Sequence, residues 1–389
     1  MRIAIVYDCL YPYTVGGAER RYHGIAARLA TRHQVTYVTR RQWPAGETPD
    51  APPGVRVVAV SGGRSLYTGA GRRNVSAPLR FGGGVLRHLL RHRDAYDVVH
   101  TCGFPYFALL AARLANTLGG PPVVTDWLEV WSREYWRDYL GPVGGRVGAA
   151  VQRLCVRLTG PAFVLSELAA RRLVREGYRG HPTILRGLHD GVTGLAAAAT
   201  ARAPLVVYIG RHIREKGVVA IPAAIAQARQ HIPELRAAIF GDGPERPRVI
   251  AAAERLGLSD IIDCPGFVSR DAVDAALDRA LCLLLPSRRE GYGLVVVEAA
   301  AHGTPSIVLR HPDSAATELI EPDRNGVIVE GDDAPMLAAA IEAVHAAGPA
   351  LAERTREWFT GNAATLGIEA TIEQLERTYA SVASTHPRR

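Results

Sequence analysis

Two acidic residues, eight positions apart, lie where the sequence most clearly predicts a binding site. Glu290 belongs to the turn Glu290-Gly291-Tyr292-Gly293, and Glu298 lies in the apolar stretch that follows. The preceding apolar run, Leu281–Leu285, predicts a buried strand, and the stretch after the turn predicts a helix. A glycine turn that leads into a helix leaves backbone amides free to bind an anion. Because carboxylates would repel a phosphate, we expect both acids to accept hydrogen bonds from hydroxyl groups, as on a sugar.

Other turns that follow predicted strands carry groups suited to phosphate. Gly16-Gly17 opens the first expected helix and can present its amides, but glycine pairs are also common in ordinary turns, and this one is not a GxGxxG dinucleotide fingerprint. Arg211 and Lys216 flank the turn after the strand at Leu205–Ile209. A guanidinium fork with an ammonium group suits a diphosphate, and the alternative is a solvated loop. Asp242, in Gly241-Asp242-Gly243, either caps the next helix or contacts a ligand.

Two series of alternating strand and helix patterns position these turns. The strands are nearly all-apolar runs rich in Val and Ile, as expected when helices cover both faces of a parallel sheet. The alternation predicts an α/β fold with two Rossmann-like parallel-sheet domains that face a central cleft. The predicted strands are Arg2–Asp8, Gln34–Thr39, Val55–Val60, Asp97–Thr101, Pro122–Thr125, Ala162–Ser166, Leu205–Ile209, Leu235–Phe240, Ile261–Pro265, Leu281–Leu285 and Ser306–Leu309. The helices predicted in the first half are Ala18–Ala30, Val85–His92, Tyr106–Leu118, Arg146–Leu158 and Glu167–Glu176.

The domain boundaries follow from length and from a lapse in the pattern. A chain of 389 residues is too long for one core, so we expect two domains. The alternation lapses in a Gly-containing stretch and an Ala run, which predicts a linker at 188–203. The expected domains are 1–187 and 204–360, followed by a C-terminal helix at 361–389 that crosses back to the first domain. The expected buried face of the tail is Trp358, Phe359, Leu366, Ile368, Ile372, Leu375 and Tyr379.

Composition and charge argue against several classes of protein. The five cysteines are scattered without a CxxC pair, and no convincing cluster of metal ligands is visible, so neither a disulfide framework nor a metal site is expected. The net charge of +8 suits phosphate-bearing ligands or an anionic membrane face, but no nucleic-acid-reading motif accompanies it. The first residues predict a strand rather than a signal peptide, and no apolar run has membrane-spanning length. We therefore expect a cytoplasmic protein.

Taken in order, the four turns resemble the motifs of the retaining glycosyltransferases of the GT-B fold, in the large family usually called GT4. The most specific match is Glu290-Gly291-Tyr292-Gly293-Leu294 with Glu298, which is similar to the paired-glutamate motif of the family. The segments that match three further family motifs are Gly16-Gly17-Ala18-Glu19, Gly210-Arg211 with Lys216-Gly217, and Gly241-Asp242-Gly243-Pro244. The resemblance covers nearly the whole chain.

The resemblance implies that a sugar moves from a nucleoside-diphosphate sugar to an acceptor hydroxyl, with the donor on the second domain and the acceptor on the first. It implies no metal and no cofactor besides the sugar nucleotide. Arg211 and Lys216 would hold the diphosphate, Glu290 the sugar hydroxyls and Glu298 the ribose hydroxyls. The base would lie near Phe240 to Pro244 and Phe267-Val268. The donor-binding positions that the resemblance implies are Gly16, Gly17, Arg211, Lys216, Gly241, Asp242, Gly243, Phe267, Val268, Glu290, Gly291, Tyr292, Gly293, Leu294, Val295 and Glu298.

The chain departs from the family pattern at one position. Many members carry a histidine after the middle strand of the first domain, and the usual position falls on Leu128 here. Asp126 and Glu129 can supply a polar contact there instead, and His100 ends the neighbouring strand. A lone histidine at a strand end is more often a structural residue. The candidate catalytic residues are Glu290, Arg211, Lys216, Asp126, Glu129 and His100.

The acceptor side is less specific. An Arg-rich stretch at 64–93 contains an amphipathic segment. This segment contacts anionic lipid at the inner face of the cell membrane, contacts a phosphorylated acceptor, or covers the sheet as an ordinary helix. An aromatic group can line an acceptor pocket or form part of the core. Its members are Trp127, Trp131, Tyr135, Trp136 and Tyr139.

Two other functions stay open on the same fold. One is a different reaction, such as that of a nucleoside-diphosphate-sugar epimerase or a glycan phosphorylase. The other is a catalytically idle scaffold that keeps the sugar-nucleotide pocket, which the missing histidine favours and the intact motif residues oppose. The sequence does not name the base, the sugar, the acceptor or the oligomeric state.

Overall fold

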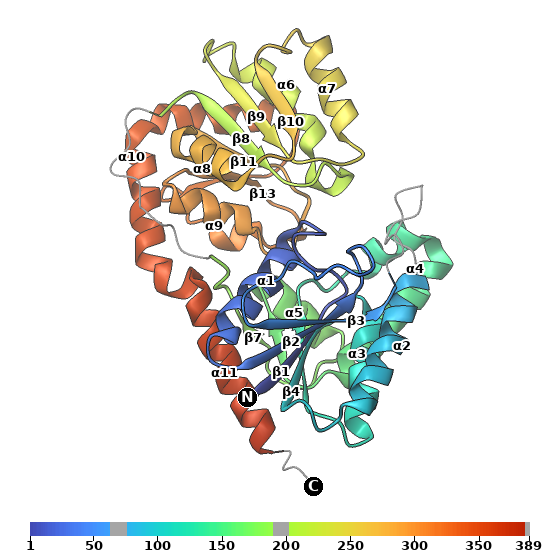
Figure 1. The fold of residues 1–389 in the computed structure, drawn as a ribbon. Coiled ribbons are helices and arrows are strands. Elements are labelled where there is room, and N and C mark those ends of the chain that lie inside the picture. Colours follow the sequence, from blue (N-terminus) through green and yellow to red (C-terminus); the bar gives the residue numbers. More distant parts are fainter. Residues whose placement is uncertain (63–75, 190–201, 386–389) are drawn as a thin grey trace. The chain divides into compact units, whose positions relative to one another are not determined.

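The computed structural model describes residues 1–62, 76–189 and 202–385 of the 389 residues. It divides into two compact units (Figure 1). Unit 1 comprises Met1–Asp190 and Gly367–Arg389, and unit 2 comprises Gly191–Leu366. Both units consist of a parallel sheet with helices, which confirms the predicted fold class.

Within its described residues, unit 1 contains a seven-stranded sheet in the order β3-β2-β1-β4-β5-β6-β7. Its strands are β1 (Arg2–Val6), β2 (Gln34–Arg40), β3 (Val55–Ser61), β4 (Val98–Cys102), β5 (Val123–Trp127), β6 (Ala162–Val164) and β7 (Thr183–Ile184). Its helices are α1 (Gly17–Ala30), α2 (Ser76–Arg91), α3 (Tyr106–Thr117), α4 (Arg133–Leu158), α5 (Glu167–Arg175) and α11 (Ile368–Ser384). The order reverses between β1 and β4, and the carboxyl ends of strands at such a reversal are where α/β folds bind ligands.

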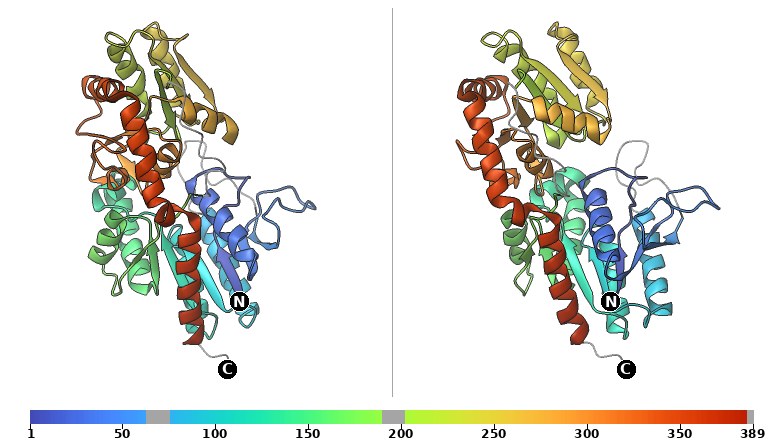
Figure 2. Two further views of the ribbon diagram at one scale, coloured as in Figure 1. Left: turned by 90° about the vertical axis from the view of Figure 1, so that its left-hand side faces the viewer. Right: turned by 60° about the vertical axis from the view of Figure 1, so that its left-hand side comes forward.

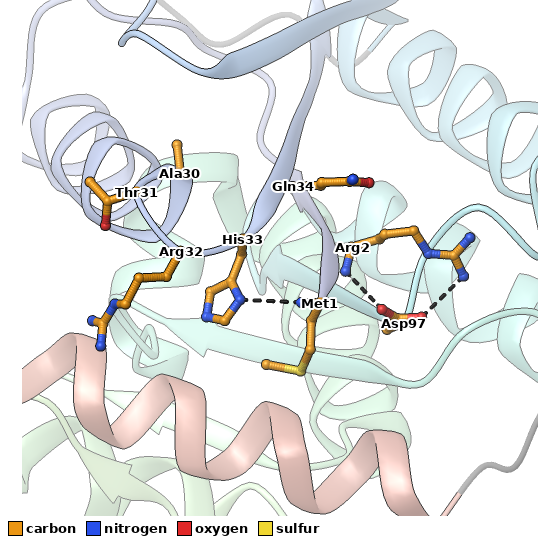
Figure 3. A pocket seen from close by; sticks show the side chains of 8 residues that line it. All are labelled: Met1, Arg2, Ala30, Thr31, Arg32, His33, Gln34 and Asp97. Carbon is orange, nitrogen blue, oxygen red and sulfur yellow. Dashed lines mark hydrogen bonds and ion pairs between the residues drawn. The ribbon is translucent and has the colours of Figure 1, made fainter.

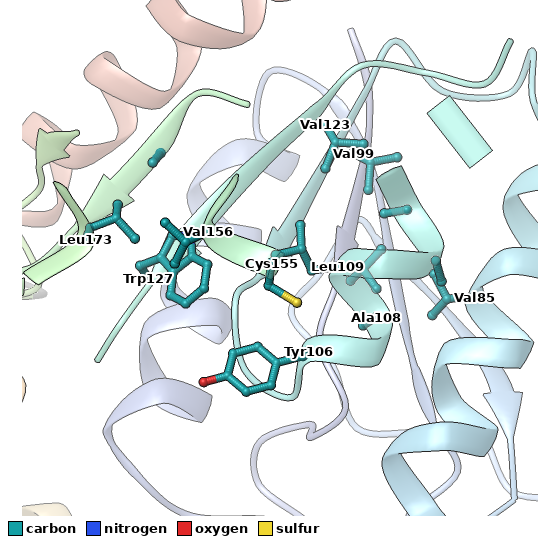
Figure 4. Packing of buried hydrophobic residues seen from close by; sticks show 14 of the residues in the cluster. Val85, Val99, Tyr106, Ala108, Leu109, Val123, Trp127, Cys155, Val156 and Leu173 are labelled. Atoms are coloured by element: carbon teal, nitrogen blue, oxygen red, sulfur yellow. The ribbon is translucent and has the colours of Figure 1, made fainter. Parts of the chain in front are cut away.

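The strands of unit 1 bury one core on each face of the sheet, because successive side chains of a strand point to opposite faces. In β1, Ala4 and Val6 pack against α2 and α3, whereas Ile3 and Ile5 pack against α1 and α11. Figure 4 shows the first core. In the second, α11 lies beside α1 (Figure 2). The predicted buried face of the tail is confirmed, since all seven of its residues are buried.

Within its described residues, unit 2 contains a six-stranded sheet in the order β10-β9-β8-β11-β13-β15 and a two-stranded sheet of β12 and β14. Its strands are β8 (Leu205–Ile209), β9 (Arg236–Phe240), β10 (Ile262–Gly266), β11 (Cys282–Leu285), β12 (Arg289–Glu290), β13 (Ser306–Leu309), β14 (Asp313–Ser314) and β15 (Gly326–Val329). Its helices are α6 (Ile221–Ala228), α7 (Arg246–Arg255), α8 (Arg270–Arg279), α9 (Leu294–Ala301) and α10 (Ala334–Leu366). Short 3₁₀ turns are η1 (Arg214–Lys216), η2 (Val218–Ala220) and η3 (Ala316–Leu319).

The end of the chain differs from the single predicted helix at 361–389. Residues up to Leu366 continue α10 in unit 2, and α11 begins at Ile368 in unit 1. The extended backbone of Gly367 (φ −71°, ψ 146°) separates the two helices. Residues 190–201, most of the predicted linker, lie outside the described residues.

One helix in the described part of the chain, α10, is long and apolar enough to cross a membrane by length and composition, although the sequence showed no such run. Core helices of soluble proteins also meet this criterion. Gly348 interrupts α10 with a non-helical backbone, and Leu337, Ile341 and Val344 are buried. Of the apolar window in α10, 33% is buried.

Every strand that the sequence predicts is present, but several elements were missed. The omissions are β7, β12, β14 and β15, the first turns of α2 and the first half of α4. The missed strands have two to four residues, too few for an apolar period to stand out. Gly and Pro interrupt the missed helical segments, and tertiary packing compensates for their low helix propensity.

Candidate functional site

The turn after β8 is tied to the turn after β9. The amide of His212 donates to the carbonyl of Asp242 (2.8 Å), and the amide of Glu245 donates to the carbonyl of His212 (2.9 Å). Gly241 has φ +116°, and a Cβ there would lie 2.0 Å from the carbonyl oxygen of Gly210. This close approach requires glycine. The two turns therefore fix the backbone from which the Arg211 side chain projects.

Lys216 lies against the end of β11. Gly217, next to it, has φ +65°, and a Cβ there would lie 2.3 Å from the carbonyl oxygen of Pro286. The Lys216 ammonium donates to Glu290 Oε1 (2.6 Å) and to the carbonyl of Arg289 (3.2 Å). An ammonium group has three donors, so a third remains for a ligand. Lys216 is the single lysine in the sequence, whereas lysine and arginine together number 46.

Glu290 is positioned by its backbone. It belongs to β12, which pairs in parallel with β14, and its carbonyl accepts from the amide of Ala315 (2.8 Å). The side chains of Lys216 and Glu290 are 17% and 12% exposed. Strands β12 and β14 therefore hold the Glu290 carboxylate next to the Lys216 ammonium, which η1 supplies.

Helix α9 begins next to this ion pair. Its N-cap is Gly293, in the left-handed region with φ +101°, which has no side chain to cap the helix. The first amide in the helix to reach a preceding carbonyl is that of Val296, which donates to Gly293 (2.8 Å). The amides of Leu294 and Val295 precede it and are the ones that a helix start offers to an anion. Tyr292, just before, is buried.

Glu298, on the same helix, forms an ion pair that sequence reasoning missed. Its carboxylate is 5% exposed and accepts from Arg270 Nη1 (2.7 Å). Arg270, the first residue of α8, also lies 2.9 Å from Asp274. Burial lowers the pKa of Arg270, but Glu298 and Asp274 raise it, and the net result is a pKa above its ordinary value. The sequence feature that could have suggested this ion pair is Arg270 itself, a basic residue three positions after Phe267.

The Asp274 carboxylate is in turn held by a histidine. His302 Nε2 lies 3.3 Å from Asp274, and His302 Nδ1 lies 2.7 Å from Asp278. A chain of polar contacts therefore runs from Glu298 through Arg270 and Asp274 to His302. It orients the Arg270 guanidinium.

Three other predicted donor residues are exposed. Asp242 accepts from the amide of Gly243 (2.7 Å), and α7 has Glu245 as its N-cap, so the capping interpretation of Asp242 is wrong. Phe267 is 67% exposed at the end of β10, next to the half-buried Val268. Arg211 is exposed, and within the described residues no hydrogen bond or ion pair occupies its guanidinium. All three side chains are accessible to a ligand.

In unit 1, the predicted phosphate contact is the start of α1. Gly16 is extended at the N-cap, and the amide of Arg20 donates to its carbonyl (3.1 Å). The Glu19 carboxylate accepts from the Tyr7 hydroxyl (3.2 Å) and lies so close to Gly16 that a Cβ there would be 2.4 Å from it. Phosphate binding at Gly16 and Gly17 would place an anion beside this carboxylate.

His100 and Asp126 lie in the interior of unit 1. Asp126 accepts from Arg21 Nε (3.2 Å) and lies 3.3 Å from His100 Nε2, while His100 Nδ1 is 2.6 Å from the Tyr379 hydroxyl. The four residues are at most 4% exposed. Burial raises the pKa of Asp126, but Arg21 and His100 outweigh it and hold that pKa well below its ordinary value. This cluster, Arg21–Asp126–His100–Tyr379, joins α1 and α11 to the sheet.

The remaining acceptor-side candidates divide between core and surface. Glu129 is half-buried and accepts from the Trp131 indole (3.0 Å). Trp127 and Trp136 are buried core residues, and Tyr135 and Tyr139 pack against Trp131. Of the three unit 1 catalytic candidates, Glu129 is the one with an exposed part.

The described half of the Arg-rich stretch covers the sheet. Val85 and Leu89 of α2 are fully buried, and Leu86 and Leu90 pack against the same core. These apolar side chains are therefore not free for lipid. Residues 63–75 lie outside the described residues.

A cavity of about 590 Å³ lies elsewhere, at the amino-terminal edge of the unit 1 sheet (Figure 3). Four of its polar groups are paired: Arg2 donates to Asp97 (3.0 Å), and the amino group of Met1 lies 3.2 Å from His33 Nδ1. It contains no predicted site residue. In the described residues, no group of three or more His, Cys, Asp or Glu side chains is placed to hold a metal.

Family models match both units of the chain. The model described as glycosyl transferases group 1 matches residues 197–358, and the model described as a glycosyl transferase 4-like domain matches residues 16–188. The chain belongs to the GT4-type glycosyltransferases of the GT-B fold. Glycogen synthase of Mycobacterium tuberculosis is 29% identical to this glycosyltransferase over 378 residues, which are 91% of this chain and 88% of that protein.

Other comparisons are partial or show the fold alone. Alpha-D-kanosaminyltransferase of Streptomyces kanamyceticus is 31% identical over 154 residues, so the chain spans 39% of that relative's length. The structure of sucrose-phosphate synthase from Thermosynechococcus elongatus superimposes with a TM-score of 0.82 at 20% identity and covers 99% of both chains. Anabaena Alr3699/HepE, solved in complex with UDP, has a TM-score of 0.72 at 18% identity over 98% of this chain and all of that chain.

Proposed function

We propose that this glycosyltransferase moves a sugar, with retention, from a nucleoside-diphosphate sugar to an acceptor hydroxyl. The observation that carries the proposal is the Lys216–Glu290 ion pair beside the open start of α9. It brings a cation, a carboxylate and helix amides to the carboxyl ends of parallel strands. The diphosphate uses the cation and the amides, and the sugar hydroxyls use the carboxylate.

In the proposed reaction, the bond between the anomeric carbon and the diphosphate breaks while the acceptor oxygen bonds to the same face of the sugar, and the acceptor hydroxyl loses its proton. Negative charge grows on the leaving diphosphate. Lys216, Arg211 and the amides of α9 stabilise that charge before and during bond cleavage. Because these cations neutralise the leaving group, we propose that the reaction needs no metal.

Glu298 is proposed to bind the ribose hydroxyls. Arg270 donates to one oxygen of that carboxylate, so ribose must share or replace this contact. Arg270 keeps Asp274 as a partner in either case, which limits the electrostatic cost of the exchange. The exposed ring of Phe267 offers the base a stacking surface.

Fewer observations bear on the role of unit 1 in the reaction. We propose Glu129 as its polar contact, whereas the burial of His100 and Asp126 supports a structural role for both. Contact of Gly16 and Gly17 with the diphosphate, and a cytoplasmic location, remain predictions from the sequence.

The test is a donor panel of UDP-, GDP-, ADP- and dTDP-sugars with and without candidate acceptors. UDP-glucose comes first, because Anabaena Alr3699/HepE has been solved with it. We expect nucleoside diphosphate to be released when acceptor is present, a product of unchanged anomeric configuration, and full activity in EDTA. Isomerised donor without acceptor would indicate an epimerase, and binding without any turnover would indicate a scaffold. Activity that EDTA removes and a divalent ion restores would contradict metal independence.

A further inference from the structure

Helix α4 carries a row of exposed apolar side chains. Gly141, with φ +76°, breaks the helix, and its second half continues to Leu158. The row lies in this second half and comprises Val143 (71% exposed), Val147 (60%), Leu154 (50%) and Leu158 (39%). Spacings of four, seven and four residues put all of them on one face of a helix. We call this row the α4 apolar face.

The opposite face fixes how the helix is rotated. Gln152 is buried, accepts from the Tyr106 hydroxyl (3.0 Å) and the Trp131 amide (3.0 Å), and donates to the Trp131 carbonyl (2.9 Å). Gly145 and Gly148 pack so closely on the first half of α4 that a Cβ at either would collide with it. Because these contacts fix the opposite side of the helix against unit 1, the α4 apolar face must point to solvent.

The charged residues within the second half of α4 are all basic. From Pro142 to Leu158 the sequence has three arginines and no acidic residue. Arg153 pairs with Glu176 (3.2 Å), whereas Arg146 and Arg157 are exposed along one edge of the face. An apolar stripe bordered by arginine matches the two layers of an anionic lipid surface, acyl chains and phosphate headgroups.

We propose that the second half of α4 binds this glycosyltransferase to an anionic lipid surface. The apolar face enters the boundary between headgroups and acyl chains, and Arg146 and Arg157 bind lipid phosphates. The charge favours this occupant over a second copy of the chain, because two such helices would bring their arginines together. The proposal does not depend on the identity of the sugar donor.

The test is co-sedimentation of the full chain with vesicles of phosphatidylcholine containing 30% phosphatidylglycerol, compared with phosphatidylcholine alone. We expect binding to the anionic vesicles that falls as salt is raised. Leu154→Ser/Leu158→Ser should reduce the partition coefficient at least ten-fold, since each removes apolar surface from the contact. Arg146→Gln/Arg157→Gln should reduce it about five-fold for each arginine.

The matched control is Leu114→Ser/Leu118→Ser on α3. These leucines are 47% and 53% exposed at the same spacing of four, so their loss costs similar solvent-exposed area without touching α4. Circular dichroism verifies that each variant is folded. Equal binding by the α4 and α3 variants, or no binding of the unaltered chain to anionic vesicles, would overturn the proposal. A dimer in solution that the α4 variants alone dissociate, without vesicle binding, would assign the face to a second copy instead.

Discussion

The structure makes a strong prediction about Asp126, a residue that the sequence favours as catalytic. Its side chain and that of Arg21 are each 1% exposed, and two nitrogen–oxygen contacts of 3.2 and 3.3 Å join them. Asp126→Asn leaves the Arg21 guanidinium buried without its counter-ion. Breaking a buried pair in this way costs about 3–5 kcal/mol. For a domain of this size, we expect the melting temperature to fall by roughly 10 °C.

The pH dependence gives the prediction a second readout. The pKa of Asp126 is lowered by folding, so its contribution is complete above the unfolded value of about 3.9 and is lost as the pH falls through the folded value. The stability difference between the unaltered chain and Asp126→Asn should therefore be constant near neutral pH and shrink in acid. Glu129→Gln is the control, because a half-buried carboxylate should cost less than about 1 kcal/mol.

Differential scanning calorimetry with transfer assays below the transition separates structure from catalysis. We expect Asp126→Asn to be less stable but to keep most of its turnover per folded molecule. A variant of unchanged stability with transfer reduced 100-fold or more would refute the structural interpretation and return Asp126 to the reacting groups.

The other predictions concern the donor side and α11. Arg211→Ala should lower kcat/KM for the donor about 100-fold in transfer assays without changing the melting temperature, because the guanidinium is exposed; an unchanged kcat/KM would remove it from the site. Gly241→Ala should destabilise unit 2 by about 3 kcal/mol and abolish nucleotide binding, whereas Gly257→Ala, also at positive φ but with open space around it, should cost about 1 kcal/mol; equal denaturation midpoints would contradict this. Glu298→Gln should weaken binding of UDP about ten-fold but that of a 2′,3′-dideoxy analogue little, by calorimetric titration; equal losses would exclude a ribose contact. Tyr379→Phe should cost about 1 kcal/mol in urea denaturation, since it removes the hydroxyl that contacts His100; a cost near zero would contradict a role for that contact.

The fold could be predicted from the sequence because long apolar runs between glycine turns specify buried parallel strands. The predicted strand Leu205–Ile209 begins and ends at the same residues as β8. The two-residue strands β12 and β14 could not be found in this way, although β12 positions Glu290. Their pairing depends on tertiary contacts between segments separated by α9.

The sequence suggested the charged residues of the candidate site but not the ion pairs that they form. Gly241 and Gly217 belong to predicted turns, and the structure shows which carbonyl each one approaches. The Arg270–Glu298 pair could not be found, because it joins two helices whose relative position the sequence does not encode locally. His100 and Asp126, at the ends of β4 and β5, were candidate catalytic residues, but α1 and α11 cover them with their own partners, Arg21 and Tyr379.

Lys216 is the proposed contact for the nucleoside diphosphate. Since Lys216 is the single lysine of the chain, an amine-reactive reagent labels it and the N-terminal amino group, and mass spectrometry separates the two products. We predict that a saturating nucleoside diphosphate slows acetylation of Lys216 at least ten-fold and leaves the N-terminal rate unchanged. Equal rates at Lys216 with and without UDP, GDP, ADP and dTDP would contradict the proposed donor site.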